Sequence, residues 1–137
     1  MQKIETSNFD NLPAKTVKYN AFKSVRYAIT GIYTAFSREP NLTFQVLVGL
    51  SFSLLGIATG RWITAMANLI LMGIVISLEM INTVVETLCD LVHPDYHPKV
   101  KIIKDMAAGA VLIVALVWLV VIIYQILIIF VFKNVPF

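Results

Sequence analysis

A run of carboxylates at the end of a long apolar segment constrains this chain more than any other feature. The segment begins near Trp62, and its first charged residue is Glu79. At about 100° per residue, five polar side chains fall on one helix face: Glu79, Asn82, Thr83, Glu86 and Asp90. An acid at the centre of a membrane helix costs about 2.5–3.5 kcal/mol to insert, so it usually faces a protein interior or a polar cavity. The run therefore predicts a functional site on a membrane helix.

The composition is that of an integral membrane protein. Of the 137 residues, 58% are hydrophobic and only 14% are charged, which is more apolar than an average soluble protein. The net charge is +3. Because the basic residues flank apolar segments, this balance indicates membrane topology rather than nucleic-acid binding. The single cysteine, Cys89, excludes an internal disulfide, and no cleavable signal peptide is expected from the polar N-terminus.

The predicted fold is all-α, with an N-terminal amphipathic surface helix and three transmembrane helices. Residues 1–17 are expected to form a polar tail, and residues 18–137 a single membrane domain. The surface helix covers 18–39, where apolar residues recur at helical spacing and basic residues lie opposite. A packing helix of a soluble domain is the alternative. Pro40 cannot continue this helix and disfavours helical geometry at Glu39.

Three apolar segments are long enough to cross a hydrocarbon core of about 30 Å. They cover residues 42–60, 62–92 and 106–132, and residues 93–104 are expected to be a loop. Most Lys and Arg residues lie before the first span or in this loop, against only Arg61 and Lys133 on the other side. By the positive-inside rule, the N-terminus, the surface helix and the acid run face the cytoplasm. The protein is therefore expected to be a multi-pass protein of the cytoplasmic membrane.

Acidic and basic residues are expected to converge at this inner boundary, namely Glu39, Glu79, Glu86, Lys104 and Asp105. Magnesium takes one or two protein carboxylates and is completed by waters and substrate phosphates, so Glu39 and Glu86 are candidate metal ligands. A lysine binds phosphate oxygens as a point charge, which suits Lys104. Glu79 lies two turns deeper than Glu86, where a lipid hydroxyl could reach it and lose a proton to it. Asn82 could donate to phosphate or orient a carboxylate.

Several kinds of site are excluded or remain as alternatives. No glycine-rich phosphate loop is present, and His93 and His97 lack the spacing and cysteine partners of a zinc site. The acids could instead be ion-pair partners in an oligomer interface, or a proton or cation relay. Lys104 could be a membrane anchor, and Asp95, Tyr96 and His97 an ordinary loop.

Two motifs with fixed spacing make the chain similar to the prokaryotic diacylglycerol kinase / undecaprenol kinase family. The first is Glu79-x-x-Asn82-Thr83-x-x-Glu86-x-x-x-Asp90. The second is Asp95-Tyr96-His97, followed by Lys104-Asp105-Met106-Ala107-Ala108-Gly109-Ala110. An upstream piece, Gly31-x-x-x-Ala35-Phe36-x-x-Glu39-x-Asn41, matches as well. The resemblance covers the chain from about Phe22 to the end of the third span.

This resemblance implies a bacterial homotrimer that binds ATP and Mg²⁺ from the cytoplasm where neighbouring subunits meet. It makes Glu79 the catalytic base, in contact with the lipid substrate, and Glu39 and Glu86 the ligands of metal and ATP. The other positions that resemble nucleotide contacts are Tyr27, Asn82, Asp95, Tyr96, His97, Lys104 and Asp105. Three positions differ from the residues common in relatives: Asn20, Thr43 and Gln45. A phosphate contact that relatives make at these positions is therefore not implied for this chain.

The loop Pro94-Asp95-Tyr96-His97-Pro98 resembles the undecaprenol kinase branch of Gram-positive bacteria. The resemblance therefore implies transfer of the γ-phosphoryl group of ATP to undecaprenol, which gives undecaprenyl phosphate. Phosphorylation of diacylglycerol to phosphatidic acid is the alternative. A membrane subunit that binds cations without catalysis is a more distant one, although a lysine beside the acids favours a phosphate site.

Overall fold

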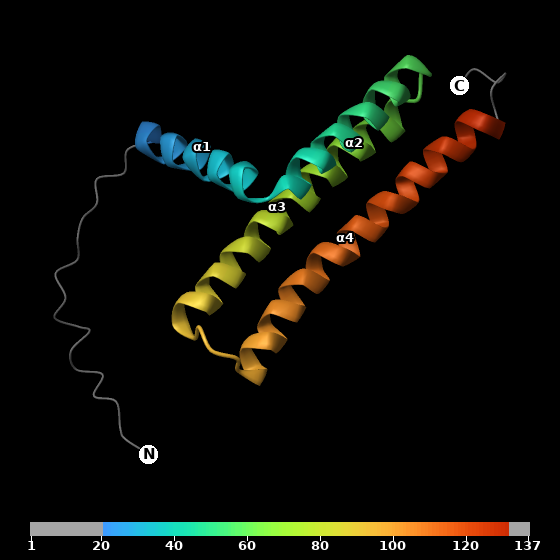
Figure 1. Ribbon diagram of the computed structural model, residues 1–137. Helices are drawn as coiled ribbons and strands as arrows, with labels where there is room; N and C mark the ends of the chain where they lie inside the picture. The colour runs from blue at the N-terminus through green and yellow to red at the C-terminus, as the bar shows by residue number, and fades with distance from the viewer. Residues whose placement is uncertain (1–20, 132–137) are drawn as a thin grey trace, which may run out of the picture. The chain divides into compact units, whose positions relative to one another are not determined.

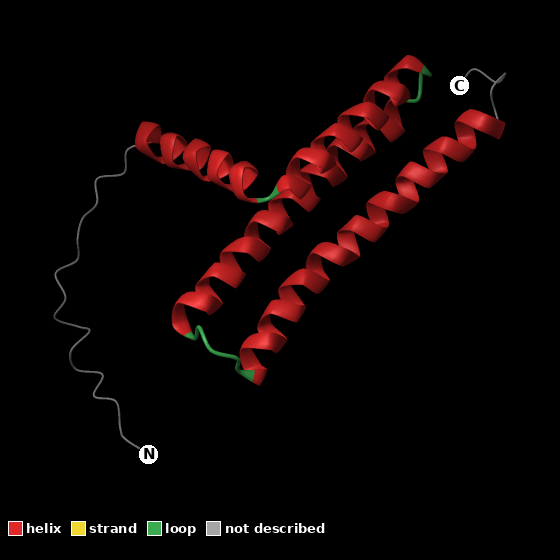
Figure 2. Ribbon diagram, viewed as in Figure 1, coloured by secondary structure: helices red, strands yellow, loops and turns green. Residues whose placement is uncertain are grey.

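The computed structural model describes residues 21–131, which form four α-helices joined by short connections (Figures 1 and 2). The helices are α1 (Ala21–Arg38), α2 (Pro40–Ala58), α3 (Trp62–Val92) and α4 (Pro98–Val131). Of these, α2, α3 and α4 are each long and apolar enough to cross a membrane. The predicted class, an all-α integral membrane protein, is confirmed. The predicted polar tail, together with Asn20 and Lys133, lies outside the described residues.

The chain divides into two compact units, Met1–Gly31 and Ile32–Phe137, and the division falls within α1. Helix α1 has no buried residue, and its apolar side chains, such as Phe22 and Ile29, are exposed. This exposure is compatible with a helix whose apolar face lies in a membrane surface. That location stays a prediction.

Glu39 separates α1 from α2, as the proline beside it predicts. Its backbone is extended, with φ −115° and ψ 94°, and it is the N-cap residue of α2. Pro40 is the first residue of α2 rather than part of a connection, so this helix begins two residues before the predicted range. The reason is that proline lacks an N–H, which the first helical residue does not need, and its fixed φ suits that position.

A tight turn at Gly60-Arg61 reverses the chain between α2 and α3. Gly60 has a φ of 73°, a conformation that glycine adopts without steric cost. The Arg61 N–H donates to the Gly56 carbonyl at 2.7 Å, and the Gly60 N–H to the Ile57 carbonyl at 3.0 Å. These bonds satisfy carbonyls that the end of α2 would otherwise leave unpaired.

Small residues set how α2 and α3 pack. Gly49, Ser53 and Gly56 are buried on one stripe of α2, with the spacing of residues on one helix face. A Cβ atom at Gly56 would lie 3.0 Å from the Cβ of Ala65 on α3, and one at Gly49 would collide with Met72. The two backbones therefore approach closely, as small residues permit between membrane helices.

A buried polar network joins α3 to α4 and α2. The Asn68 amide donates to Gln125 Oε1 at 2.5 Å and accepts from the Trp118 indole N–H at 3.0 Å. Gln125 in turn donates to the Phe52 carbonyl of α2 at 2.7 Å. Both amide side chains are fully buried, and buried polar groups require such partners. The network fixes the register of α4 against the α2–α3 hairpin.

The expected loop 93–104 is shorter than predicted, and this is a correction. Helix α4 begins at Pro98, not at Met106, so Lys99, Lys101 and Lys104 all lie on its first turns. Proline is favoured at the first position of a helix, and the Lys101–Asp105 ion pair supports the same turns at i, i+4 spacing. The sequence interpretation treated the two prolines alike, although Pro94 lies in a loop and Pro98 starts a helix.

Candidate functional site

Three carboxylates gather around the sequence motif on α3, and each accepts a hydrogen bond from a neutral side chain. Gln45 Nε2 donates to Glu79 Oε1 at 3.1 Å, and Asn82 Nδ2 donates to Glu86 Oε1 at 2.9 Å. The third carboxylate, Glu39, accepts a hydrogen bond from the Thr83 hydroxyl. Because these donors are neutral, they orient the carboxylates without cancelling their negative charge.

Thr83 ties Glu39 to the acid run of α3. Its hydroxyl lies 3.3 Å from Glu39 Oε1 and 3.1 Å from the backbone oxygen of Glu79. Thr83 follows Glu79 by about one turn and precedes Glu86 by three residues, so Glu39 meets α3 between these two acids. The predicted convergence of Glu39 with the α3 carboxylates is thus present within a single chain.

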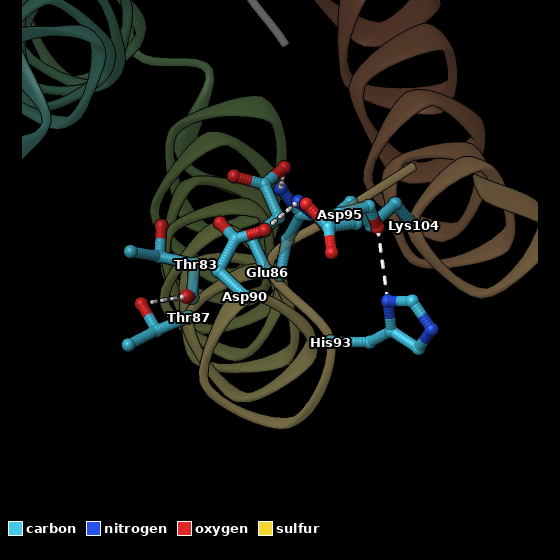
Figure 3. Close-up of polar contacts among 8 residues, drawn as sticks. Thr83, Glu86, Thr87, Asp90, His93, Asp95 and Lys104 are labelled. Carbon is cyan, nitrogen blue, oxygen red and sulfur yellow. Dashed lines mark hydrogen bonds and ion pairs between the residues drawn. The ribbon is translucent and has the colours of Figure 1, made fainter. Parts of the chain in front are cut away.

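Lys104 reaches the same run from α4. Its Nζ donates to Asp90 Oδ1 at 2.6 Å (Figure 3), and Asp90 lies about one turn beyond Glu86 on α3. Asp105 does not share this contact, because it pairs with Lys101 on the exposed side of α4. The structure therefore brings Lys104 to the acid run through Asp90, whereas Asp105 is directed to a different partner.

The loop between α3 and α4 carries three more predicted nucleotide contacts. Asp95 and Tyr96 are exposed, and His97 is half-buried. His93 Nδ1 lies 3.0 Å from the Asp95 carbonyl oxygen (Figure 3), and His97 Nδ1 accepts the backbone N–H of Lys99 at 3.2 Å. The loop is thus held by local contacts at the end of α3 that bears Asp90. Tyr27 belongs to the unit that ends at Gly31, and its side chain is exposed.

The donor atoms near Glu86 suit a hard cation. Among residues 21–131, no group of three His, Cys, Asp or Glu side chains could hold a metal ion. Magnesium does not need one, since it takes one or two carboxylates and leaves the other positions to water and phosphate. Asn82 Oδ1 is buried and has no hydrogen-bond partner among the described residues. It lies next to the Glu86 carboxylate, which accepts a hydrogen bond from the nitrogen of the same amide. Oxygen donors of this kind fit Mg²⁺ completed by a nucleotide.

A pocket of about 410 Å³ lies elsewhere, at the start of α3. Residues 60–64, Tyr124 and Ile128 line it, and no carboxylate is among them. It is therefore separate from the candidate site, which lies toward the other end of α3.

Two residues of this site were not singled out from the sequence. Gln45 was noted only as a departure from relatives, yet it contacts Glu79 directly. Asp90 was counted in the acid motif without a role, and it is the partner of Lys104. Helical spacing from Gly49 could have placed Gln45 on the α3-facing stripe, but nothing local shows which α3 residue lies opposite.

Comparison with known proteins agrees with these observations. The chain is 34% identical over 97 residues to the undecaprenol kinase of Bacillus subtilis (strain 168). The matched region covers 70% of this chain and 79% of that protein. It is 36% identical over 99 residues to the diacylglycerol kinase of a Synechocystis species, and this match covers 71% of the chain. That second match spans only 57% of the Synechocystis protein. No solved structure matches the chain significantly.

The family model for prokaryotic diacylglycerol kinase matches residues 26–127. This range includes Glu39, the acid run of α3, the α3–α4 loop and Lys104. With most of the chain matched and the motif residues brought together in the fold, the chain belongs to the prokaryotic diacylglycerol kinase family of membrane lipid kinases.

Proposed function

We propose that this lipid kinase transfers the γ-phosphoryl group of ATP to the hydroxyl of undecaprenol, which gives undecaprenyl phosphate. The observation that supports this most is the meeting of Glu39 with the α3 acids at Thr83. It assembles carboxylates from two segments far apart in sequence, and Lys104 approaches the same run from α4. Carboxylates and a lysine at one end of a membrane-helix bundle are what a magnesium-bound triphosphate requires.

In this proposal, Glu79 is the general base. It takes the proton of the lipid hydroxyl while the hydroxyl oxygen bonds to the γ-phosphorus and ADP leaves. Glu79 lies deeper along α3 than Glu86 by seven residues, which is about 10 Å of helix. In this proposal the separation would leave the base on the membrane side of the nucleotide, where a lipid alcohol could enter.

Glu39 and Glu86 would hold Mg²⁺, with the unpartnered Asn82 Oδ1 as a further oxygen donor. When bound, Mg²⁺ neutralises charge on the phosphate oxygens. Lys104 would supply a second positive charge to the phosphates. For this, its ammonium group would leave Asp90 and bind the phosphate oxygens instead. Tyr27, Asp95, Tyr96, His97 and Asp105 remain proposed nucleotide contacts.

We also propose that the active unit is a homotrimer with its sites between neighbouring subunits, and that ATP enters from the cytoplasmic face of a bacterial membrane. The described chain buries little of α2, α3 and α4 within itself. Large apolar faces remain available for lipid and for other copies. Chemical cross-linking in membranes should give trimers.

The choice of undecaprenol over diacylglycerol rests on the relatives. The Bacillus subtilis undecaprenol kinase is matched over 79% of its length, and the Synechocystis diacylglycerol kinase over 57%. Phosphorylation of diacylglycerol to phosphatidic acid is therefore the second candidate. A cation-binding subunit without catalysis is disfavoured by Lys104, because a cation site gains nothing from a lysine beside its acids.

A phosphoryl-transfer assay tests this proposal. Purified protein in vesicles receives radiolabelled ATP, Mg²⁺ and either undecaprenol or diacylglycerol, and the labelled lipid is separated and counted. We expect faster labelling of undecaprenol. Faster labelling of diacylglycerol would select the second candidate, and no labelling of either lipid with no binding of Mg·ATP would contradict the kinase assignment.

The matched variants are Glu79→Gln and Ser77→Ala. Glu79→Gln keeps the shape but removes the base, so turnover should fall by at least about a thousandfold while Mg·ATP still binds. Ser77 lies on the same helix, and its exposed hydroxyl donates to the Gly73 carbonyl one turn earlier, so Ser77→Ala should retain turnover. Wild-type turnover in Glu79→Gln would show that another group is the base.

A further inference from the structure

Gln45 is the side chain that the structure places against Glu79. Its Nε2 donates to Glu79 Oε1 at 3.1 Å, and both side chains are half-buried. The two residues are 34 positions apart in the chain and lie on different helices. The contact therefore exists only because α2 and α3 pack as an antiparallel hairpin.

The packing register of the hairpin makes this contact specific. Leu42, Gln45 and Gly49 recur at the spacing of one helix face, and Leu42 and Gly49 are buried. Gly49 lies against Met72, which precedes Glu79 by two turns. Four residues back from Gly49 along α2, the same register brings Gln45 about level with Ile76 of α3, three residues before Glu79. Close packing thus sets the height of Gln45, and its long side chain spans the remaining distance of about one turn to Glu79.

The orientation of the Gln45 amide is set by charge. An ionised carboxylate can only accept hydrogen bonds, so the amide must turn its N–H toward Glu79. Gln45 Oε1 is then buried without a hydrogen-bond partner in the described part of the chain. An unpaired buried carbonyl is unfavourable, and buried polar groups are rarely left so. The hydrogen bond to Glu79 holds the amide in this orientation, although its oxygen is left unpaired.

We propose that Gln45 is a positioning residue for Glu79: by holding Oε1 of the carboxylate, it leaves Oε2 to receive the proton of the lipid hydroxyl. This inference rests on the proposed function, in which Glu79 is the base. The lipid O–H bond breaks as the Oε2–H bond forms, and the lipid oxygen bonds to the γ-phosphorus. The bond between that phosphorus and the bridging oxygen breaks, and its electron pair leaves with ADP.

A neutral donor suits this role better than a charged residue. A lysine or arginine at position 45 would pair with Glu79 and weaken it as a base, and a second carboxylate would repel it. The amide fixes one oxygen and leaves the charge of the carboxylate in place. Removing such a hydrogen bond should therefore affect the chemical step more than the binding of either substrate.

The kinetic test uses Gln45→Leu, Gln45→His and a matched control. Gln45→Leu removes the donor and should lower kcat roughly 10- to 100-fold, with the KM values for ATP and lipid changed less than about twofold. Gln45→His restores a neutral N–H and should recover most of kcat. The control is Ser77→Ala, which removes an exposed hydroxyl of α3 that donates to the Gly73 carbonyl, and it should keep its kcat.

A wild-type kcat in Gln45→Leu would overturn the inference. So would a loss that Gln45→His does not repair, or one that appears in KM rather than in kcat. Thermal unfolding in detergent is measured on every variant, so that kcat is compared only among folded proteins.

A second measurement does not depend on turnover. The difference infrared spectrum of wild type minus Glu79→Gln isolates the carboxylate stretching band of Glu79. The same subtraction made in the Gln45→Leu background should give a shifted band, and made in the Ser77→Ala background an unshifted one. An unmoved band in Gln45→Leu would show that Gln45 does not hold the carboxylate. If the wild type phosphorylates neither lipid, the proposed function fails, but the infrared band still shows whether Gln45 contacts Glu79. If the wild type is active and Gln45→Leu is equally active, only the positioning role fails.

Discussion

Gly56→Ala tests whether close helix approach holds the α2–α3 hairpin together. An added Cβ would lie 3.0 Å from Ala65 Cβ and 3.1 Å from both the Cα and the backbone N of Ala65. Two of these atoms belong to the backbone and cannot rotate away. Ordinary contact begins near 3.4 Å, so the helices would have to part locally by about 0.3–0.4 Å.

The expected change in stability is a difference of two terms. Alanine in a helix interior is favoured over glycine by about 1 kcal/mol, whereas overpacking a close contact costs about 1–3 kcal/mol. Gly56→Ala should therefore lower the free energy of unfolding by about 0–2 kcal/mol. A Cβ added at Gly73, on α3, would meet nothing within 4 Å outside its own helix backbone. Gly73→Ala should gain the propensity term alone, about 1 kcal/mol.

The assay is reversible unfolding in mixed micelles, with the helical circular dichroism signal followed as the fraction of denaturing detergent rises. Gly56→Ala should unfold first, the wild type next and Gly73→Ala last. If Gly56→Ala proves as stable as Gly73→Ala, the close approach at Ala65 does not limit the packing, and the register argument for Gln45 loses its support.

Three further predictions concern the site and the polar network. Glu86→Gln should raise the Kd of Mg·ATP about tenfold or more, measured by calorimetry, because a proposed metal ligand is lost; an unchanged Kd would remove Glu86 from the proposed metal site. Lys104→Met should likewise weaken Mg·ATP binding about tenfold, whereas the exposed Lys99→Met should not, and equal effects of the two would reduce Lys104 to general surface charge. Asn68→Leu should lower the free energy of unfolding by about 1–3 kcal/mol, because it leaves Gln125 and Trp118 without their partner. The same micelle assay measures this, and a stability equal to that of the wild type would show that the network is replaceable.

Features that depend on short stretches of chain could be derived from the sequence. The spans follow from apolar length, since a membrane helix must satisfy its own backbone hydrogen bonds. The break at Glu39 follows from Pro40. The start of α4 was placed too late because Pro98 can either end a segment or begin a helix, and local sequence does not distinguish the two. Lys101 and Asp105 pair one turn apart, a contact that depends on that missed turn.

Local patterns in the chain were enough to predict the N-terminal helix, the three membrane-length helices and the acids on one face of α3. Which residues meet across helices became known from the packed fold, namely Gln45 with Glu79, Thr83 with Glu39 and Lys104 with Asp90. Helical periodicity fixes the face on which a residue lies, but not its height against a neighbouring helix. That height is set by where glycine lets two backbones touch and where buried amides find partners, and both depend on residues far apart in the chain.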